Sequence, residues 1–237
     1  MRQVTLVLFD IDGTILSSDG AGKRAFGVAL AEVFGEVDAR DYRFDGKTDP
    51  QIGRELLRIA GHADERIDAG MPRLFERYLA GLVEELAATG PRSHLLPGVA
   101  ELLDSLEQRE DAVLGLLTGN IELGAALKLR AVGIDPARFK VGAFGSDHEH
   151  RRALPEVARR RARERLALDV PPERIAVIGD TPADIDCAHS AGARAIAVAT
   201  GRYSVEELRE HKPAAVFRDL TKTDAVMEAI FACRLSA

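Results

Sequence analysis

The chain has 237 residues, of which 46% are hydrophobic and 30% charged, a composition typical of a folded globular protein and not of a disordered one. With 32 basic and 38 acidic residues its formal net charge is −6, which gives no support for binding to nucleic acid or to an anionic membrane. Cys187 and Cys233 are too few for a disulfide framework, and no apolar run reaches the ~18–20 residues of a membrane span. We therefore expect a cytoplasmic protein with one full domain and a smaller second unit.

The chain begins with a nearly continuous apolar run at residues 4–9, as expected for a strand that is buried on both faces of a parallel sheet. The segment 17–91 that follows is far longer than the ~2–6 residues of an ordinary strand-to-helix loop and contains no convincing buried strand. We interpret it as a small all-helical cap domain, with hinges at 17–20 and 90–93, where small residues, glycine and proline gather. Helices are predicted in the cap at residues 22–34, 50–60 and 64–88.

After the cap, apolar strands alternate with amphipathic helices up to the C-terminus. Strands are predicted at residues 112–117, 175–178, 195–198 and 214–217. Helices are predicted at residues 99–106, 123–131, 154–168, 183–191 and 205–210. This alternation predicts an α/β fold in which a Rossmann-like parallel sheet carries helices on both faces. Residues 1–16 and 92–237 then form one core domain, interrupted by the cap.

Polar side chains follow three of the predicted strands. Asp10 and Asp12 come directly after the first strand, and Thr118 follows the strand at 112–117. Asp180 and Asp184 follow the strand at 175–178. Because ligands bind outside the carboxyl ends of the strands in open parallel sheets, we expect these side chains to share one crevice.

The spacing of Asp10 and Asp12 has a chemical consequence. Residues two apart in extended backbone point their side chains to the same side, and two neighbouring carboxylates repel each other unless a cation lies between them or one is protonated. Asp180 brings further negative charge. Mg²⁺ fits such a group because it binds oxygen ligands, keeps several waters and shares a substrate phosphate. The alternative is that these aspartates only cap turns.

Three stretches resemble signatures of the haloacid-dehalogenase-like (HAD-like) hydrolase superfamily: LVLFDIDGTIL the first, LLTGN the second and IGDTPADIDCAHSAGA the fourth. FDGKTDPQI in the cap and VATGRYSVEEL near the C-terminus resemble the phosphoglycolate-phosphatase-like branch. The resemblance covers nearly the whole chain. It implies a core with a helical cap and a Mg²⁺-dependent phosphatase that acts through an aspartyl-phosphate intermediate.

The resemblance also implies roles for the three aspartates nearest the predicted metal. Asp10 is expected to be the nucleophile that attacks phosphorus. Asp12 is expected to act as general acid to the leaving oxygen and then as general base to water, while its backbone carbonyl binds the metal. Asp180 is expected to complete the protein's magnesium ligands.

The remaining motif residues are expected to surround these three. The resemblance places Asp184 where it acts through water or orients a neighbour. It implies that the Thr118 hydroxyl holds a phosphoryl oxygen, assisted by the backbone N–H groups of Gly119 and Asn120. Thr118 is otherwise a candidate helix N-cap.

The chain departs from the family at the third signature, which usually carries a lysine. No lysine lies between Lys140 and Lys212. Arg151 or Arg152 is therefore expected to supply the positive charge that balances the aspartates and grips phosphate, which arginine does with paired hydrogen bonds. We favour Arg151 for this role.

In the cap, Lys47 lies in a polar turn before a helix opened by Pro50, and closure of the cap would bring it to the anionic far end of a substrate. The alternative is a solvent-exposed lysine. We expect a Mg²⁺-dependent phosphomonoester hydrolase, monomeric or homodimeric, that acts on a small phosphorylated metabolite resembling phosphoglycolate. Within the superfamily a phosphosugar mutase remains an alternative, whereas the intact aspartate set argues against a non-catalytic binding module.

Overall fold

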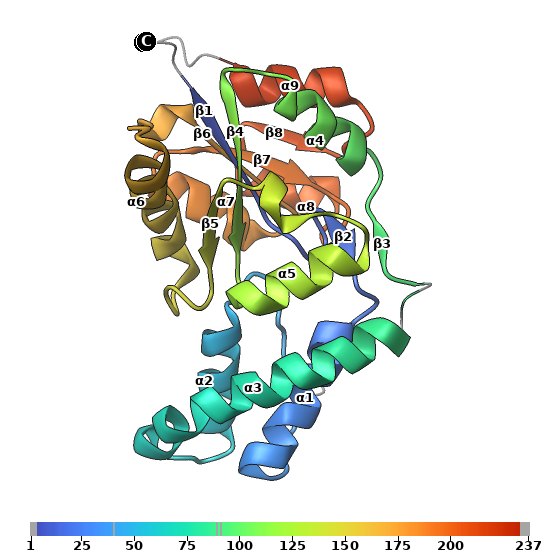
Figure 1. The fold of residues 1–237 in the computed structure, drawn as a ribbon, viewed down its shortest axis with the longest axis vertical. Coiled ribbons are helices and arrows are strands. Elements are labelled where there is room, and N and C mark those ends of the chain that lie inside the picture. Colours follow the sequence, from blue (N-terminus) through green and yellow to red (C-terminus); the bar gives the residue numbers. More distant parts are fainter. Residues whose placement is uncertain (1–3, 40, 89, 91, 233–237) are drawn as a thin grey trace.

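The computed structural model describes residues 4–39, 41–88, 90 and 92–232, and it has the predicted α/β architecture (Figure 1). Among these residues six strands form one sheet in which every pair is parallel, in the order β5-β4-β1-β6-β7-β8. The strands are β1 (Thr5–Phe9), β4 (Ala112–Thr118), β5 (Val141–Phe144), β6 (Ile175–Gly179), β7 (Arg194–Val198) and β8 (Ala215–Phe217). The edge strand β5 was not predicted, because its four residues include a glycine and give no clear pattern.

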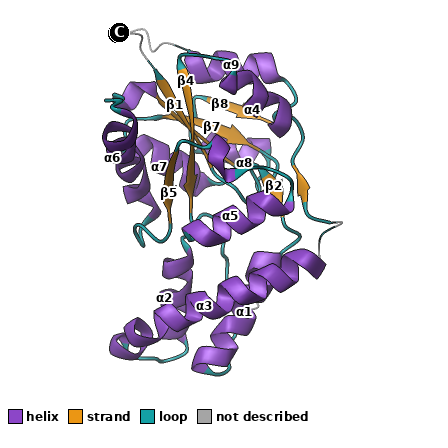
Figure 2. Ribbon diagram, in the orientation of Figure 1, coloured by secondary structure: helices purple, strands orange, loops and turns teal. Residues whose placement is uncertain are grey.

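Helices cover both faces of this sheet (Figure 2). One face packs against α4 (Val99–Glu107), α5 (Glu122–Ala131) and α9 (Thr223–Phe231). The other face packs against α6 (Leu154–Leu166), α7 (Pro182–Ser190) and α8 (Val205–Glu210). The Rossmann-like fold is thus confirmed, with α9 as a helix that was not predicted.

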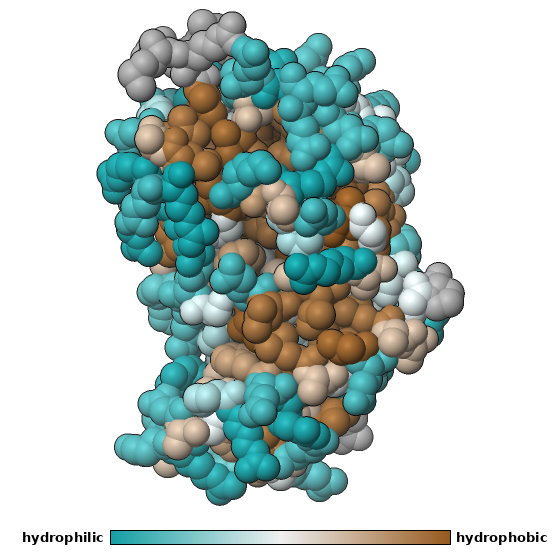
Figure 3. Space-filling model, viewed as in Figure 1, coloured by the Kyte–Doolittle hydropathy of each residue, from teal (hydrophilic) through white to brown (hydrophobic). Residues whose placement is uncertain are grey.

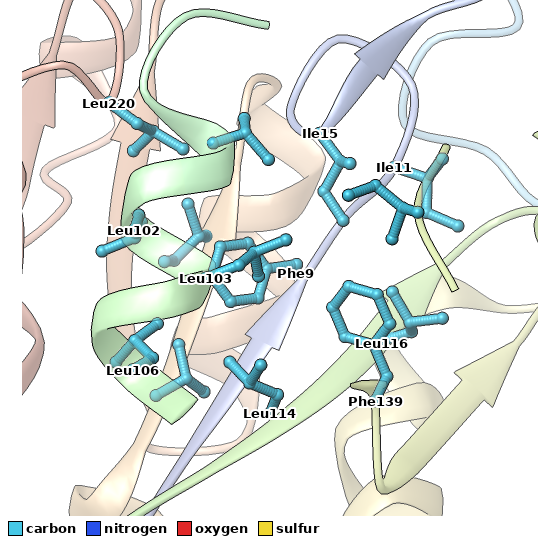
Figure 4. Packing of buried hydrophobic residues seen from close by; sticks show 14 of the residues in the cluster. Phe9, Ile11, Ile15, Leu102, Leu103, Leu106, Leu114, Leu116, Phe139 and Leu220 are labelled. Carbon is cyan, nitrogen blue, oxygen red and sulfur yellow. The ribbon is translucent and has the colours of Figure 1, made fainter. Parts of the chain in front are cut away.

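Strand β1 lies at the centre of the core, and its side chains enter both apolar layers. Phe9 packs edge-on against Phe139, with ring centroids 6.4 Å apart, and the leucines of α4 surround it (Figure 4). Leu6 and Leu8 point into the opposite layer with α6 and α7. Burial on both faces explains the nearly continuous apolar run, and it places Asp10 at the middle of the sheet's carboxyl edge.

The helical cap consists of α1 (Ala21–Phe34), α2 (Asp49–Ile59) and α3 (Asp64–Ala88), which share an apolar cluster of their own around Phe26 and Tyr78. Two short antiparallel strands, β2 (Leu16–Ser17) and β3 (His94–Leu95), join where the chain enters and leaves it. We propose residues 17–91 as the cap and 1–16 with 92–237 as the core. Pro91 of the second predicted hinge, residues 1–3 and residues 233–237 with Cys233 lie outside the described residues.

The cap meets the core beside the sheet's carboxyl edge. Helix α3 packs against α5, and apolar surface gathers over these helices (Figure 3). Val83 on α3 and Leu123 on α5 are both exposed. In the described part of the chain, none of the helices combines the length and the apolar character needed to cross a membrane.

Candidate active site

A cavity of about 350 Å³ lies between the carboxyl edge of the sheet and the cap. Strands β4, β1 and β6 are neighbours, so the residues at their carboxyl ends meet there. The core contributes Asp10, Asp12, Thr118, Gly119, Asn120, Arg151 and Asp180 to its wall, and the cap contributes Lys23, Phe44, Lys47, Asp49 and Tyr78.

Asp10, Asp180 and Asp184 are buried and form an acidic cluster in which one carboxylate oxygen from each lies within 4.8 Å of the other two. The pKa of Asp10 is raised to about 6, because burial and the charges of Asp184 and Asp12 together outweigh the opposing charge of Arg151. Burial and the charges of Asp184 and Asp10 raise the pKa of Asp180 well above its ordinary value. Three oxygen donors that repel one another fit a hard divalent cation such as Mg²⁺.

The glycine after Asp12 explains how the chain leaves β1 without blocking this cluster. Gly13 has φ +82°, a left-handed conformation that favours glycine, and a Cβ atom there would lie 2.4 Å from a carboxylate oxygen of Asp180. Thr14 follows and donates its hydroxyl to Asp180 Oδ1 at 3.1 Å. Gly13 and Thr14 of the DxDGT motif therefore also help to hold the Asp180 side chain in place.

Arg151 and Arg152, which the sequence left as alternatives, lie in different environments. Arg151 is buried, and its Nη2 lies 2.9 Å from Asp10 Oδ1 and also pairs with Asp184. Arg152 has a 71% exposed side chain and lies 3.2 Å from Asp186. Only Arg151 is within reach of the acidic cluster.

Asp184 is positioned from both sides. One carboxylate oxygen accepts from the Thr181 backbone N–H at 3.0 Å and from its hydroxyl at 2.7 Å, in the capping box that starts α7. The other oxygen pairs with Arg151. Asp184 thus links the start of α7 to Arg151, and through it to Asp10.

The Asp12 side chain pairs with a lysine that the sequence analysis did not single out. Its carboxylate does not belong to the acidic cluster; Oδ2 accepts from Lys128 Nζ at 2.6 Å and from Asn120 Nδ2 at 2.8 Å. Burial alone would raise the pKa of Asp12, but the charge and hydrogen bond of Lys128 bring it below its ordinary value. Lys128 therefore offsets the Asp12 charge from within the protein.

Sequence reasoning missed Lys128, although a signal was present. Lys128 lies on α5 three residues after Ala125 and one before Leu129, both buried, so it belongs to the helix's apolar stripe. A lysine on such a stripe is unusual unless it is paired.

The loop after β4 contains the other predicted phosphate ligands. The Thr118 hydroxyl is buried and accepts from the Asn120 backbone N–H at 3.3 Å and from its Nδ2 at 2.8 Å, so its own proton remains able to bind an anion. Gly119 is required by close packing, because a Cβ atom there would lie 2.0 Å from the Lys47 carbonyl oxygen. Thr118 does not cap α5, whose N-cap is Ile121.

Lys47 lies on the cap side of the cavity and is paired within the cap. Its Nζ lies 2.6 Å from Glu55 Oε2 and 2.7 Å from the Tyr42 hydroxyl, and Tyr42 also donates to Glu55. Burial would raise the pKa of Glu55, but hydrogen bonds from Lys47, Tyr42 and Gln51 hold it at about 2. An anionic ligand group therefore competes with Glu55 for this lysine.

Asp49, a second residue that sequence reasoning missed, joins the cap to the phosphate loop. Its carboxylate accepts from the Ile121 backbone N–H at 2.8 Å, and its own N–H donates to the Gly119 carbonyl at 2.8 Å. Burial raises the pKa of Asp49 to about 6. The start of α2 thereby rests on the loop that follows β4.

Comparisons with known proteins identify the family of this chain. Residues 151–223 match the model of the HAD-hydrolase-like family. The chain is 30% identical to Protein CbbY of Cereibacter sphaeroides over 86% of this chain and 87% of that one, and 27% identical to a phosphoglycolate phosphatase of Mesorhizobium japonicum over 89% of each. A solved structure of CbbY from Rhodobacter sphaeroides in complex with xylulose-(1,5)-bisphosphate superposes with a TM-score of 0.71 at 23% identity, covering 93% of this chain and 96% of that one.

Proposed function

The chain belongs to the HAD-like hydrolase family and is a phosphatase, and we propose that it is a Mg²⁺-dependent phosphomonoester hydrolase of small phosphorylated metabolites. The observation that carries this proposal is the buried acidic cluster of Asp10, Asp180 and Asp184. Buried carboxylates that repel one another are retained in proteins where they serve binding or catalysis.

The donor set supports Mg²⁺ as the cofactor. Asp10, Asp180 and the backbone carbonyl of Asp12 would hold the ion, while Asp184 is occupied by Thr181 and Arg151. When bound, Mg²⁺ offsets the negative charge of the phosphoryl oxygens and of the carboxylates around them.

The side chains of this site are suited to two proton-coupled displacements. In the first displacement, a carboxylate oxygen of Asp10 attacks phosphorus and forms a bond to it. The bond from phosphorus to the leaving oxygen breaks, and Asp12 protonates that oxygen. Asp12 then takes a proton from the water that hydrolyses the aspartyl-phosphate. Thr118 donates to a phosphoryl oxygen, and Arg151 orients Asp10 and offsets its charge.

The cavity supports a substrate with a second anionic group. Lys23 and Lys47 of the cap line the cavity together with Asp10 and Asp180, and its volume of about 350 Å³ suits a metabolite of a few carbon atoms. Phosphoglycolate and sugar bisphosphates, named for the relatives, both carry such a group. We propose a phosphoglycolate-like substrate that engages Lys47 through its second anion.

Phosphate release from a panel of small phosphorylated metabolites tests this function. We expect turnover with Mg²⁺, none with a chelator, and none from Asp10→Asn, whereas Asp186→Asn, which alters a half-exposed acid, retains it. Activity that is equal with and without chelator would refute the metal assignment. Release of an isomerised sugar phosphate in place of inorganic phosphate would instead identify the mutase alternative.

A further inference from the structure

The most informative feature outside the motifs is the ammonium group of Lys128. Its Nζ lies 2.6 Å from Asp12 Oδ2 and 2.6 Å from Asn120 Oδ1, and Asn120 Nδ2 lies 2.8 Å from the same Asp12 oxygen. Three side chains from two separate segments thus form a closed triangle of charge-assisted hydrogen bonds. The Lys128 side chain is only 6% exposed, whereas that of Asp12 remains 41% exposed.

The surroundings hold this lysine in place from the cap side as well. A Cβ atom on Gly22, at the start of α1, would lie 3.0 Å from Lys128 Nζ, so the cap leaves little room around the ammonium. Burial of a lysine is costly unless its charge is paired, and the partners used here are Asp12 and Asn120, both of which line the cavity. The contact therefore constrains a functional carboxylate and not only the fold.

The two aspartates of the DxD motif consequently have separate cations. Arg151 pairs with Asp10 and Asp184, on the side of the acidic cluster. Lys128 pairs with Asp12 on the other side. This separation keeps the Asp12 carboxylate out of the acidic cluster while leaving part of it open to the cavity.

We propose that Lys128 is a positioning residue, which together with Asn120 holds the Asp12 carboxylate where it protonates the leaving oxygen and then accepts a proton from water. The proposal rests on the proposed function, which assigns proton transfer to Asp12. Lys128 neither gains nor loses a proton in these steps. Misplacement of a reacting group by about 1 Å is enough to cost roughly 100-fold in rate.

The test compares two phosphate esters whose leaving groups differ in how much they need protonation by Asp12. The leaving group of ethyl phosphate is ethoxide, a strong base that must be protonated as it leaves. The leaving group of p-nitrophenyl phosphate is p-nitrophenolate, a stable anion that hardly needs a proton. With Mg²⁺ present, we expect Lys128→Met to lower kcat/KM, which reports only the steps up to release of the alcohol, about 100-fold on ethyl phosphate and less than about threefold on p-nitrophenyl phosphate. Asp12→Asn should show the same split, and the double variant should lose little more than Asp12→Asn alone.

Lys140→Met is the matched control, because Lys140 is exposed and donates to the Ala137 carbonyl away from the cavity. Equal losses of kcat/KM on both esters would overturn the proposal and make Lys128 a substrate-binding or purely structural residue. If Lys128→Met does not fold, Lys128→Gln takes its place.

A readout independent of turnover completes the test. In a crystal structure of the Lys128 variant we expect the Asp12 carboxylate to leave its present position while the β1 backbone stays in place. An unmoved Asp12 would overturn the proposal whatever the kinetics. Failure of the proposed function looks different, because the unmodified protein and Lys140→Met would then hydrolyse neither ester with Mg²⁺.

Discussion

The two walls of the cavity are built in different ways. On the core wall, Asp10, Asp180 and Arg151 are buried at the ends of sheet strands or in the turn before α6, and each is held by partners from distant segments. On the cap wall, Lys47 is only partly buried and pairs with Glu55, a partly buried residue eight positions later in the cap. The difference indicates that the core wall is preorganised, whereas the cap wall can exchange its internal ion pair for contacts with a substrate.

The largest expected effect tests the core wall. Arg151→Met would leave Asp10 and Asp184 without their buried cation, and breaking such a pair costs about 3–5 kcal/mol. We expect a fall of this size in the free energy of unfolding, measured with urea, together with loss of phosphatase activity. Arg151→Lys, which restores a cation, should recover much of both.

Arg152→Met is the control for that experiment. Its side chain is exposed and its ion pair with Asp186 is a surface pair, so the change should stay within about 0.5 kcal/mol. If the Arg152 variant is as unstable as Arg151→Met, the contrast between a buried and a surface arginine is wrong.

The next largest expected effect concerns the stability contribution of Asp49, which connects the cap wall to the loop after β4. The pKa of Asp49 is raised by burial from its ordinary 3.8 to about 6, with Asp12 also raising it and Lys128 and the Ile121 N–H lowering it. The folded protein therefore binds this proton more tightly than the unfolded chain, so the stabilisation that Asp49 contributes is fully present below about pH 4 and is lost as the pH rises to about 6. The full difference is about 3 kcal/mol.

Asp49→Asn should remove this dependence while its side-chain oxygen still accepts from Ile121. We expect the free energy of unfolding of the variant, relative to that of the unmodified protein, to increase as the pH rises from about 4.5 to about 7. A constant difference across this range would show that Asp49 stays ionised in the fold. The loop between the walls would then not be the pH-sensitive element.

A smaller effect concerns Mg²⁺ at the core wall. Saturating Mg²⁺ should raise the free energy of unfolding by about 1–3 kcal/mol at pH 7, because it offsets the repulsion among Asp10, Asp180 and Asp184. Asp180→Asn should be more stable than the unmodified protein without Mg²⁺ and should respond little to it. Thermal unfolding with Mg²⁺ and with chelator checks both, and an unchanged Mg²⁺ response in Asp180→Asn would remove Asp180 from the ligand set.

The smallest effect is expected at the cap wall. Lys47→Met should raise KM about tenfold, or about 1.4 kcal/mol, for phosphoglycolate, whose carboxylate would lose its partner. For p-nitrophenyl phosphate, which has no second anion, KM and kcat should change less than about twofold. Lys140→Met again serves as the control, and equal effects on both substrates would mean that Lys47 does not recognise the second anion.

Much of this molecule could be predicted from local patterns. The apolar run before Asp10 identifies a strand buried on both faces, and the position of polar residues after each strand predicts which ones meet at its carboxyl edge. Glycine at position 13 follows from the tight turn. These features depend on backbone periodicity and on a few residues with special conformational preferences, which the sequence displays directly.

Other features were decided only by the tertiary structure. Arg151 and Arg152 are adjacent and chemically identical, and only the path of the chain before α6 buries one and exposes the other. Lys128 and Asp49 acquire their roles from partners 116 and 72 residues away, which no local pattern connects. The sequence by itself determined the fold class and the acidic residues at the strand ends, because these follow from short-range patterning. The pairing of each buried charge required the assembled fold, because electrostatic partners are set by proximity in space.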